Sequence, residues 1–311
     1  MKTCAISIDL DPLTAYYQIH GLGEPPQQLA GTIIARALPR FIELFAEADV
    51  PATFFLVGRD LTQSEIAKRM AKELVGAGHE LANHTFSHPY DLCRLPDAEI
   101  AREISQAHET IAEICSDAHA PVGFRSPGYF INGRVLDALS AQGYQYDTSM
   151  FPSPPYWLAK ILVMGTMFLR GRRSDAVVTD PRGLSTPLLP YRPDRERPWR
   201  RGDAPLIELP VTVLPGMRLP AIGTLFAAGP RWLRERVLGA VSKLPFFNFE
   251  LHGIDLADAV DDRIPTELAG RQPDLRIPYT EKRRAFLGVI NQLKHEGFQF
   301  VTLKQAAARY S

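Results

Sequence analysis

The sequence predicts an α/β protein with a largely parallel sheet or barrel, formed as a single domain over residues 1–311. Strand-like and helix-like segments alternate at short spacing through the first half of the chain, which is typical of such folds. The alternation stops between residues 152 and 205, where prolines and arginines accumulate, and it then returns. We therefore expect one barrel-like domain with a long insertion at 152–205, because a two-domain chain would need a clearer linker.

The first elements follow one another closely. Residues 5–8 are apolar and predict a buried strand, and residues 52–57 are aromatic and β-branched, which favours a second strand. Apolar residues recur at helical spacing over 32–48 and 64–75, and Gly76 would close the second of these helices.

The pattern continues with a short strand before Asn83 and a helix from an N-capping Asp97 to about Cys115. Strands are expected at 122–125 and 144–147, around a helix near 134–141. After the insertion we expect strands at 206–213, 246–251 and 299–303, and helices near 231–244 and 281–296.

Composition excludes several classes of protein. The 311 residues are 45% hydrophobic, which excludes a disordered chain, and the 35 basic residues balance the 35 acidic ones. A nucleic-acid partner is therefore not expected. The cysteines Cys4, Cys93 and Cys115 are odd in number and scattered, and no secretory signal or apolar run of about 20 residues is visible. These features predict a cytoplasmic protein and leave peripheral contact with the inner face of the membrane open.

Polar residues follow several predicted strands at the edge where α/β folds place their sites. Asp9 and Asp11 end the first strand, and in an extended chain both carboxylates face one side, where a cation would relieve their repulsion. His84 and His88 are four residues apart, so one helical turn would bring both rings to one cation. The alternatives are an exposed loop for the aspartates and a turn-stabilising pair for the histidines.

Three further strand ends carry polar groups. Arg125 opens the turn 125–129, where proline and glycine fix the chain and the guanidinium could hold a carboxylate. Asp147 and His252 end two later strands. A lone histidine is more often structural than catalytic, but five polar groups at successive strand ends together indicate a site.

The ordered motifs Asp-x-Asp, His-x-x-x-His, Arg-x-Pro-Gly-Tyr, Asp-x-Ser-x-x-Pro and Leu-His-Gly resemble those of the polysaccharide deacetylase superfamily, the NodB-homology or carbohydrate esterase 4-like proteins. The resemblance covers about residues 3–149 and 206–303. It implies a distorted (β/α)₇-type barrel and a hydrolase of carbon–nitrogen bonds that removes an acyl group, usually from a sugar, with the help of a metal.

The resemblance also implies a metal site. Asp11, His84 and His88 would be the ligands of a divalent metal, and zinc is the first expectation for mixed nitrogen and oxygen donors. Cobalt, nickel, manganese and iron remain alternatives. The family more often has two adjacent aspartates, so the division of roles between Asp9 and Asp11 stays open.

The remaining roles come from the same resemblance. Asp9 would be the general base, and Arg125 would keep it ionised and oriented. The backbone around Tyr129 would help to hold the oxyanion, and His252 would be the general acid. Asp147 is a candidate partner of that histidine.

The composition of the insertion gives an indication of the substrate class. Residues 157–173 form an apolar stretch with Trp157 at one end and arginines at the other, and residues 157–201 hold nine arginines and one lysine against four acidic residues. Such a segment suits a lipid surface, but a buried core helix with an arginine-rich loop is the alternative. A second apolar segment, 221–228, could form a groove with it.

Three hypotheses follow. The first is a metal-dependent hydrolase that removes an acetyl or formyl group from a lipid-linked amino sugar, similar in setting to the deformylase of undecaprenyl-phosphate aminoarabinose synthesis. The second is a deacetylase of soluble or wall-derived sugars, or a hydrolase of small cyclic amides. The third is a catalytically silent barrel that binds carbohydrate or lipid.

Overall fold

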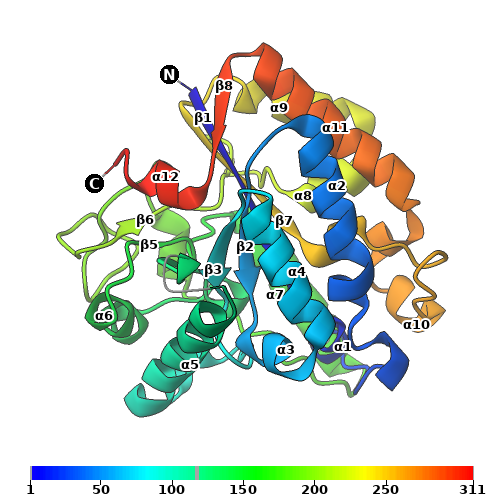
Figure 1. Ribbon diagram of the computed structural model, residues 1–311, viewed down its shortest axis with the longest axis horizontal. Helices are drawn as coiled ribbons and strands as arrows, with labels where there is room; N and C mark the ends of the chain where they lie inside the picture. Colours follow the sequence, from blue (N-terminus) through cyan, green and yellow to red (C-terminus); the bar gives the residue numbers. More distant parts are fainter. Residues whose placement is uncertain (1, 116–118, 311) are drawn as a thin grey trace.

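A computed structural model describes residues 2–115 and 119–310 of the chain. A curled parallel sheet lies at its centre, with helices around the outside (Figure 1). The strands are β1 (Lys2–Asp9), β2 (Thr53–Leu56), β3 (Glu80–Asn83), β4 (Gly123–Phe124), β5 (Tyr146–Asp147), β6 (Ile207–Glu208), β7 (Phe246–His252) and β8 (Phe298–Val301). All of their pairings are parallel, as the alternating pattern predicts.

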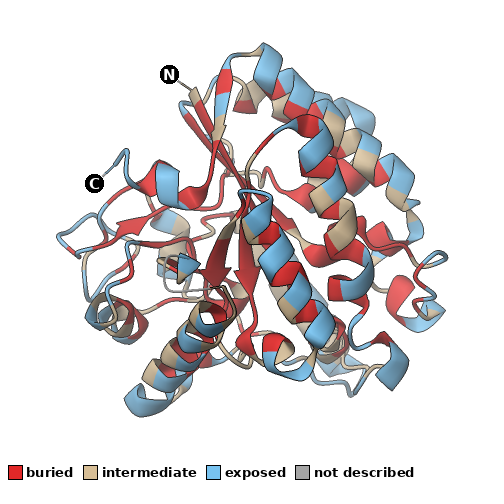
Figure 2. Cartoon of the chain, in the orientation of Figure 1, coloured by how far each residue is buried: buried red, intermediate tan, exposed pale blue. Residues whose placement is uncertain are grey.

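The helices fill the connections between these strands. They are α1 (Leu13–Ile19), α2 (Leu38–Ala48), α3 (Gly58–Gln63), α4 (Glu65–Gly76), α5 (Asp97–Cys115), α6 (Gly133–Ala141), α7 (Pro154–Leu169), α8 (Gly223–Ala228), α9 (Arg231–Val241), α10 (Thr266–Ala269), α11 (Tyr279–His295) and α12 (Leu303–Ala307). Figure 2 shows that α2, α4 and α5 turn a buried face inward and an exposed face outward. Their apolar residues at helical spacing therefore build the core.

The barrel is open on one side. The strand order is β6-β5-β4-β3-β2-β1-β7, with β8 paired to β1. The two ends of this path are bridged by Asn248 on β7, which donates through Nδ2 to Leu209 O at 3.1 Å and through its backbone N–H to Thr212 Oγ1 at 2.9 Å. A distorted barrel is thus confirmed, and a side-chain amide spans its seam.

Three details differ from the expectations. Asp97 is the first residue of α5 rather than its N-cap, since Ile100 N–H donates to Pro96 O, and the Asp97 carboxylate instead meets Arg134. The predicted strand 206–213 is reduced to the two residues of β6, because Pro210 has no N–H for the ladder. The last strand ends at Val301, and Thr302 caps α12.

The segment 152–205 contributes no strand to the sheet among the residues described. It contains α7, whose N-cap Ser153 accepts a hydrogen bond from Tyr156 N–H, followed by a 3₁₀ turn and irregular chain. None of the residues of α7 is buried. The alternative interpretation of this segment as a buried core helix is therefore wrong. No helix in the described chain is both long and apolar enough to cross a bilayer.

Candidate metal centre and active site

The carboxyl end of β1 places two buried aspartates at the middle of the sheet edge. Asp11 lies 3.1 Å through Oδ1 from Nε2 of His84 and 3.1 Å from Nε2 of His88. Burial alone would raise the pKa of Asp11, but the two histidines outweigh it and hold that pKa well below its usual value. The structure thus joins the Asp-x-Asp and His-x-x-x-His motifs at one point.

The two histidines reach Asp11 from a loop and not from a helical turn, so the expected helical geometry is wrong. Both Thr85 and His88 have positive φ angles, 66° and 61°, which fold the chain back on itself. Asn83 Oδ1 accepts from Thr85 N–H at 2.7 Å, and Thr85 Oγ1 accepts from His88 N–H at 3.0 Å. These polar side chains stabilise a backbone that residues other than glycine rarely adopt.

The three side chains have the chemistry of a metal site. His84 Nδ1 lies 2.7 Å from the Arg125 carbonyl oxygen, so the proton belongs on Nδ1 and the lone pair on Nε2. The possible ligand atoms of Asp11, His84 and His88 all lie within 4.8 Å of one another, and all three residues are buried. Two neutral imidazoles and one carboxylate fit a divalent cation such as zinc.

Asp9 forms an ion pair with Arg125 and does not contact the two histidines through a hydrogen bond. Arg125 is fully buried, and its Nη1 donates to Asp9 Oδ1 at 2.5 Å. Its Nε donates to Thr148 O at 3.1 Å and its Nη2 to Ser7 Oγ at 2.8 Å, while Phe55 stacks against the guanidinium. The geometry therefore separates the two aspartates: Asp11 faces the histidines, and Asp9 faces the arginine.

His252, at the end of β7, has a partner that the motifs did not reveal. Its Nδ1 lies 2.8 Å from Oε1 of the buried Glu250, and its Nε2 lies 3.2 Å from the Tyr129 hydroxyl. Burial would lower the pKa of His252, but Glu250 outweighs it and raises that pKa well above the ordinary value. The signal in the sequence was a glutamate two residues earlier in an apolar strand, on the same face.

Asp147 does not contact this histidine, so its candidacy as the partner is wrong. Its carboxylate accepts from the Ser149 hydroxyl at 2.6 Å and from Ser149 N–H at 3.2 Å, and it is hydrogen-bonded with Glu208. It therefore supports the ends of β5 and β6 behind Arg125. The amide of Tyr129, also expected near the chemistry, already donates to Ser126 O at 3.1 Å.

A second group of ligand-type atoms, those of Asp9, Glu250 and His252, also lies within 4.8 Å. Both nitrogens of His252 already have protein partners, as does Asp9. This group therefore fits proton transfer better than metal binding.

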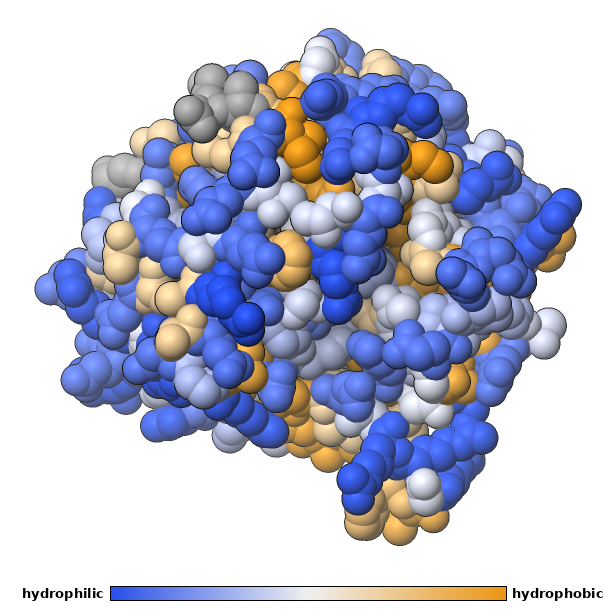
Figure 3. Space-filling model, turned by 60° about the horizontal axis from the view of Figure 1, so that its bottom comes forward, coloured by the Kyte–Doolittle hydropathy of each residue, from blue (hydrophilic) through white to orange (hydrophobic). Residues whose placement is uncertain are grey.

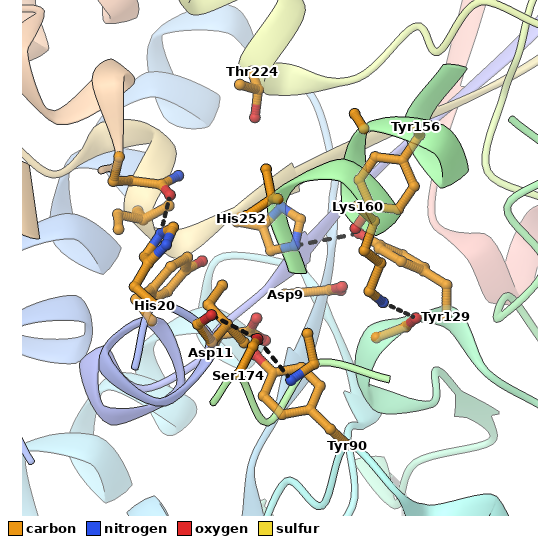
Figure 4. Close-up of a pocket in the computed structure, with 18 of the residues that line it drawn as sticks. Asp9, Asp11, His20, Tyr90, Tyr129, Tyr156, Lys160, Ser174, Thr224 and His252 are labelled. Carbon is orange, nitrogen blue, oxygen red and sulfur yellow. Dashed lines mark hydrogen bonds between the residues drawn. The ribbon is translucent and has the colours of Figure 1, made fainter. Parts of the chain in front are cut away.

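One cavity of about 370 Å³ lies against the Asp11–His84–His88 cluster, Asp9 and His252. Asp9, Asp11, His84 and His252 lie on its inner side, and Figure 4 shows Asp9 and His252 pointing into the same space as Lys160. The rest of the lining is mainly apolar or aromatic, with Ile19, Tyr90, Phe151, Tyr156, Ala159, Val163, Met164, Ala176, Ile222 and Ile254, and it also includes the polar Tyr16, His20, Tyr129, Lys160, Ser174, Thr224 and Gln272. The cavity thus combines a polar floor, formed by the four residues of its inner side, with a largely apolar wall.

The helix α7 forms much of that wall. Its residues Tyr156, Lys160, Val163 and Met164 recur at helical spacing and line the cavity. The segment 221–228 contributes less than expected to a shared groove: Ile222 and Thr224 line the cavity, whereas Phe226 and Ala227 are buried in the core.

Comparison with known proteins points to one family. Residues 30–146 match the family model described as polysaccharide deacetylase. The chain is 26% identical over 160 residues to a peptidoglycan deacetylase of Helicobacter pylori, which covers 50% of this chain and 52% of that protein. It is 39% identical over 90 residues to a chitooligosaccharide deacetylase of a Bradyrhizobium strain, 29% of this chain and 38% of that one. The chain therefore spans about half or less of the length of these curated relatives.

The fold has a solved counterpart of nearly the same extent. A Mycobacterium smegmatis structure assigned to the polysaccharide deacetylases superposes with a TM-score of 0.61 at 18% identity, covering 99% of this chain and 90% of that one. At this identity the match concerns the fold alone. It supports the curled parallel sheet described above.

Proposed function

We propose that this chain, whose residues 30–146 match the polysaccharide deacetylase family model, is a metal-dependent hydrolase that removes an N-acyl group, acetyl or formyl, from an amino sugar. One observation carries the proposal. The Asp11–His84–His88 cluster, the Arg125–Asp9 pair and the Glu250–His252 pair each contribute at least one side chain to the lining of one cavity. Together they offer a metal site, a base and an acid, the parts that amide hydrolysis needs.

Asp11, His84 and His88 would hold the metal. A divalent metal held by these residues would supply Lewis-acid chemistry, which polarises an acyl carbonyl and makes water more acidic. Zinc suits the donor set, and cobalt, nickel, manganese or iron suit it as well. His84 keeps the required tautomer through its hydrogen bond to the Arg125 carbonyl oxygen.

Asp9 and His252 would move the protons. The Arg125 guanidinium donates to Asp9 Oδ1 and so orients the carboxylate, which would take the proton of the attacking water. Glu250 holds a proton on His252, which can then pass to the nitrogen of the leaving amine. Tyr129, which donates to Glu250 Oε1 at 2.9 Å, would orient the histidine.

For the substrate we propose an amino sugar in a lipid-linked glycan intermediate, handled at the inner face of the cytoplasmic membrane. The apolar wall of the cavity supports this proposal, because a polar glycan chain gains little from it. The outer face of α7 adds support: Leu158, Leu162, Phe168 and Leu169 are 60 to 85% exposed and precede Arg170 and its neighbours. The insertion 152–205 would then serve as the membrane-facing wall of one catalytic domain.

A second candidate is a deacetylase of soluble or wall-derived N-acetyl sugars. The names of the relatives, which are peptidoglycan and chitooligosaccharide deacetylases, favour it. The insertion would then only pack over the cavity, and turnover would not respond to lipid or detergent.

Mass spectrometry of lipid-linked sugars separates the two candidates. A bacterial membrane extract is analysed before and after incubation with the metal-loaded protein and with His88→Ala as the inactive control. If the substrate is lipid-linked, we expect a lipid-linked sugar to lose the mass of a formyl or acetyl group after incubation with the unaltered protein but not with His88→Ala. Turnover of soluble acetylated sugars with no change in the lipids would support the second candidate. Metal binding without hydrolysis of either class would overturn both.

A further inference from the structure

Lys160 is a cation in an unusual position. It lies on the cavity side of α7, and its Nζ reaches toward Gly128 O at 3.5 Å, beside the loop that carries Tyr129 (Figure 4). No carboxylate of the described chain lies within ion-pair distance of this ammonium group. Its neighbours on the same face of α7 are the apolar or aromatic Tyr156, Val163 and Met164.

A half-buried charged group is normally accompanied by an opposite charge, and Lys160 lacks one in the described chain. Burial lowers the pKa of Lys160 to about 8, with no acidic side chain to offset it. The charges on the cavity floor do not supply a partner, because Asp9 is paired with Arg125 and Asp11 with the two histidines. A ligand that brings an anion to this point would restore the missing interaction.

The position of the ammonium group restricts the kind of ligand. It stands between the catalytic floor and the apolar wall of α7, so the anion belongs between the acylated amino group and an apolar portion of the substrate. Phosphate esters have this arrangement, and lysine binds phosphate as a compact point charge.

We propose that Lys160 is a phosphate-binding residue of the substrate pocket, and that the acylated amino sugar carries a phosphate ester. The inference rests on the proposed function and narrows its substrate class. The phosphate could belong to a lipid phosphodiester or to a free sugar phosphate, since the recognition chemistry is the same.

Binding measurements test this without relying on turnover. The metal-loaded protein, Lys160→Met and the exposed control Lys72→Met are titrated in a calorimeter with decyl phosphate and with uncharged decyl glucoside. We expect Lys160→Met to weaken decyl phosphate binding by about tenfold or more and to change decyl glucoside binding less than about twofold. Lys72→Met should match the unaltered protein. A thermal unfolding curve shows whether the Lys160→Met protein is folded.

The outcomes are distinct. Equal weakening of both probes would assign Lys160 a structural role and overturn the inference, as would unchanged binding of decyl phosphate or its failure to bind the unaltered protein. N-acetylglucosamine 1-phosphate identifies the source of the phosphate. If it loses affinity as decyl phosphate does, a free sugar phosphate suffices, and if only the tailed probe binds, the lipid form is the ligand. A protein that binds these probes but hydrolyses no amide would refute the proposed function and leave the phosphate site intact.

Discussion

The floor and the outer wall of the cavity are built on opposite principles. On the floor, Arg125 and Glu250 are buried, and each holds one charged partner in place. On the wall, α7 has no buried residue and turns large apolar side chains to the outside. Figure 3 shows a mostly hydrophilic face on which hydrophobic residues reach the surface in several places, among them the upper middle and the lower edge.

This difference indicates that the two regions of the cavity have separate functions. Buried charged groups need partners of opposite charge, so the floor of the cavity tolerates few substitutions. Its residues therefore determine the type of reaction. An exposed helix can change its residues without disturbing the core, so the wall is free to select the substrate. Substitutions on the floor should therefore affect catalysis and stability, and substitutions on the wall should affect affinity.

The largest effect is expected on the floor. His84→Ala removes one of three proposed metal ligands, and we expect activity to fall by about a thousandfold or more together with the loss of bound metal. Metal analysis, an amide hydrolysis assay and circular dichroism measure the three properties. His295→Ala, at the exposed end of α11, is the control. A metal-free His84→Ala protein with full activity would refute the metal site.

Arg125→Met should reduce stability. It leaves the buried carboxylate of Asp9 without its counter-charge, which costs about 3 to 5 kcal/mol in the free energy of unfolding. Urea denaturation measures this loss. The double variant Asp9→Asn, Arg125→Met should recover part of it, because no unpaired charge then remains buried. If the two substitutions are simply additive, the pair does not interact as described.

Glu250→Gln should change the pH dependence. Glu250 raises the pKa of His252, so its removal lowers that pKa, and the protonated acid is lost at a lower pH. The alkaline limb of the kcat/KM profile should move to lower pH, while Glu73→Gln, exposed on α4, leaves it in place. An unmoved limb would mean that another group carries the proton.

The smallest effect on stability is expected from substitutions on the exposed face of α7. Leu162→Glu with Phe168→Glu should weaken binding to phosphatidylglycerol vesicles by about tenfold, because two apolar side chains leave the interface. The free energy of unfolding should change by about 0.5 kcal/mol or less per site. Vesicle sedimentation measures the binding. Ile66→Glu, an exposed position on α4, is the matched control, and equal binding by all three proteins would exclude α7 as the contact.

The sequence predicted the strand ends well because they carry unusual residues. Asp9, Asp11 and His252 each follow an apolar strand, so their meeting follows from the parallel order of the strands. The structure does place the expected Arg125 beside Asp9. Their chemical roles stay predictions until the variants are measured.

What the sequence did not predict depends on tertiary contacts. Glu250 resembled an ordinary strand residue, and only its distance to His252 reveals its role. The loop of His84 and His88 resembled a helical turn because spacing alone does not encode positive φ angles. The exposure of α7 depends on what packs against it, and an apolar stretch of sixteen residues fits a core helix equally well.

The backbone of the site has a further consequence for attempts to make the protein more heat-resistant. Six non-glycine residues of the described chain have positive φ, and three of them, Thr85, His88 and Tyr129, belong to the loops around the cavity. Glycine would relieve about 1 kcal/mol of backbone strain at each position, but it would also delete a buried hydroxyl, imidazole or phenol together with its contacts. Relieving the backbone strain would therefore cost the side-chain contacts of the site, so engineering libraries for thermal resistance should hold the three positions fixed.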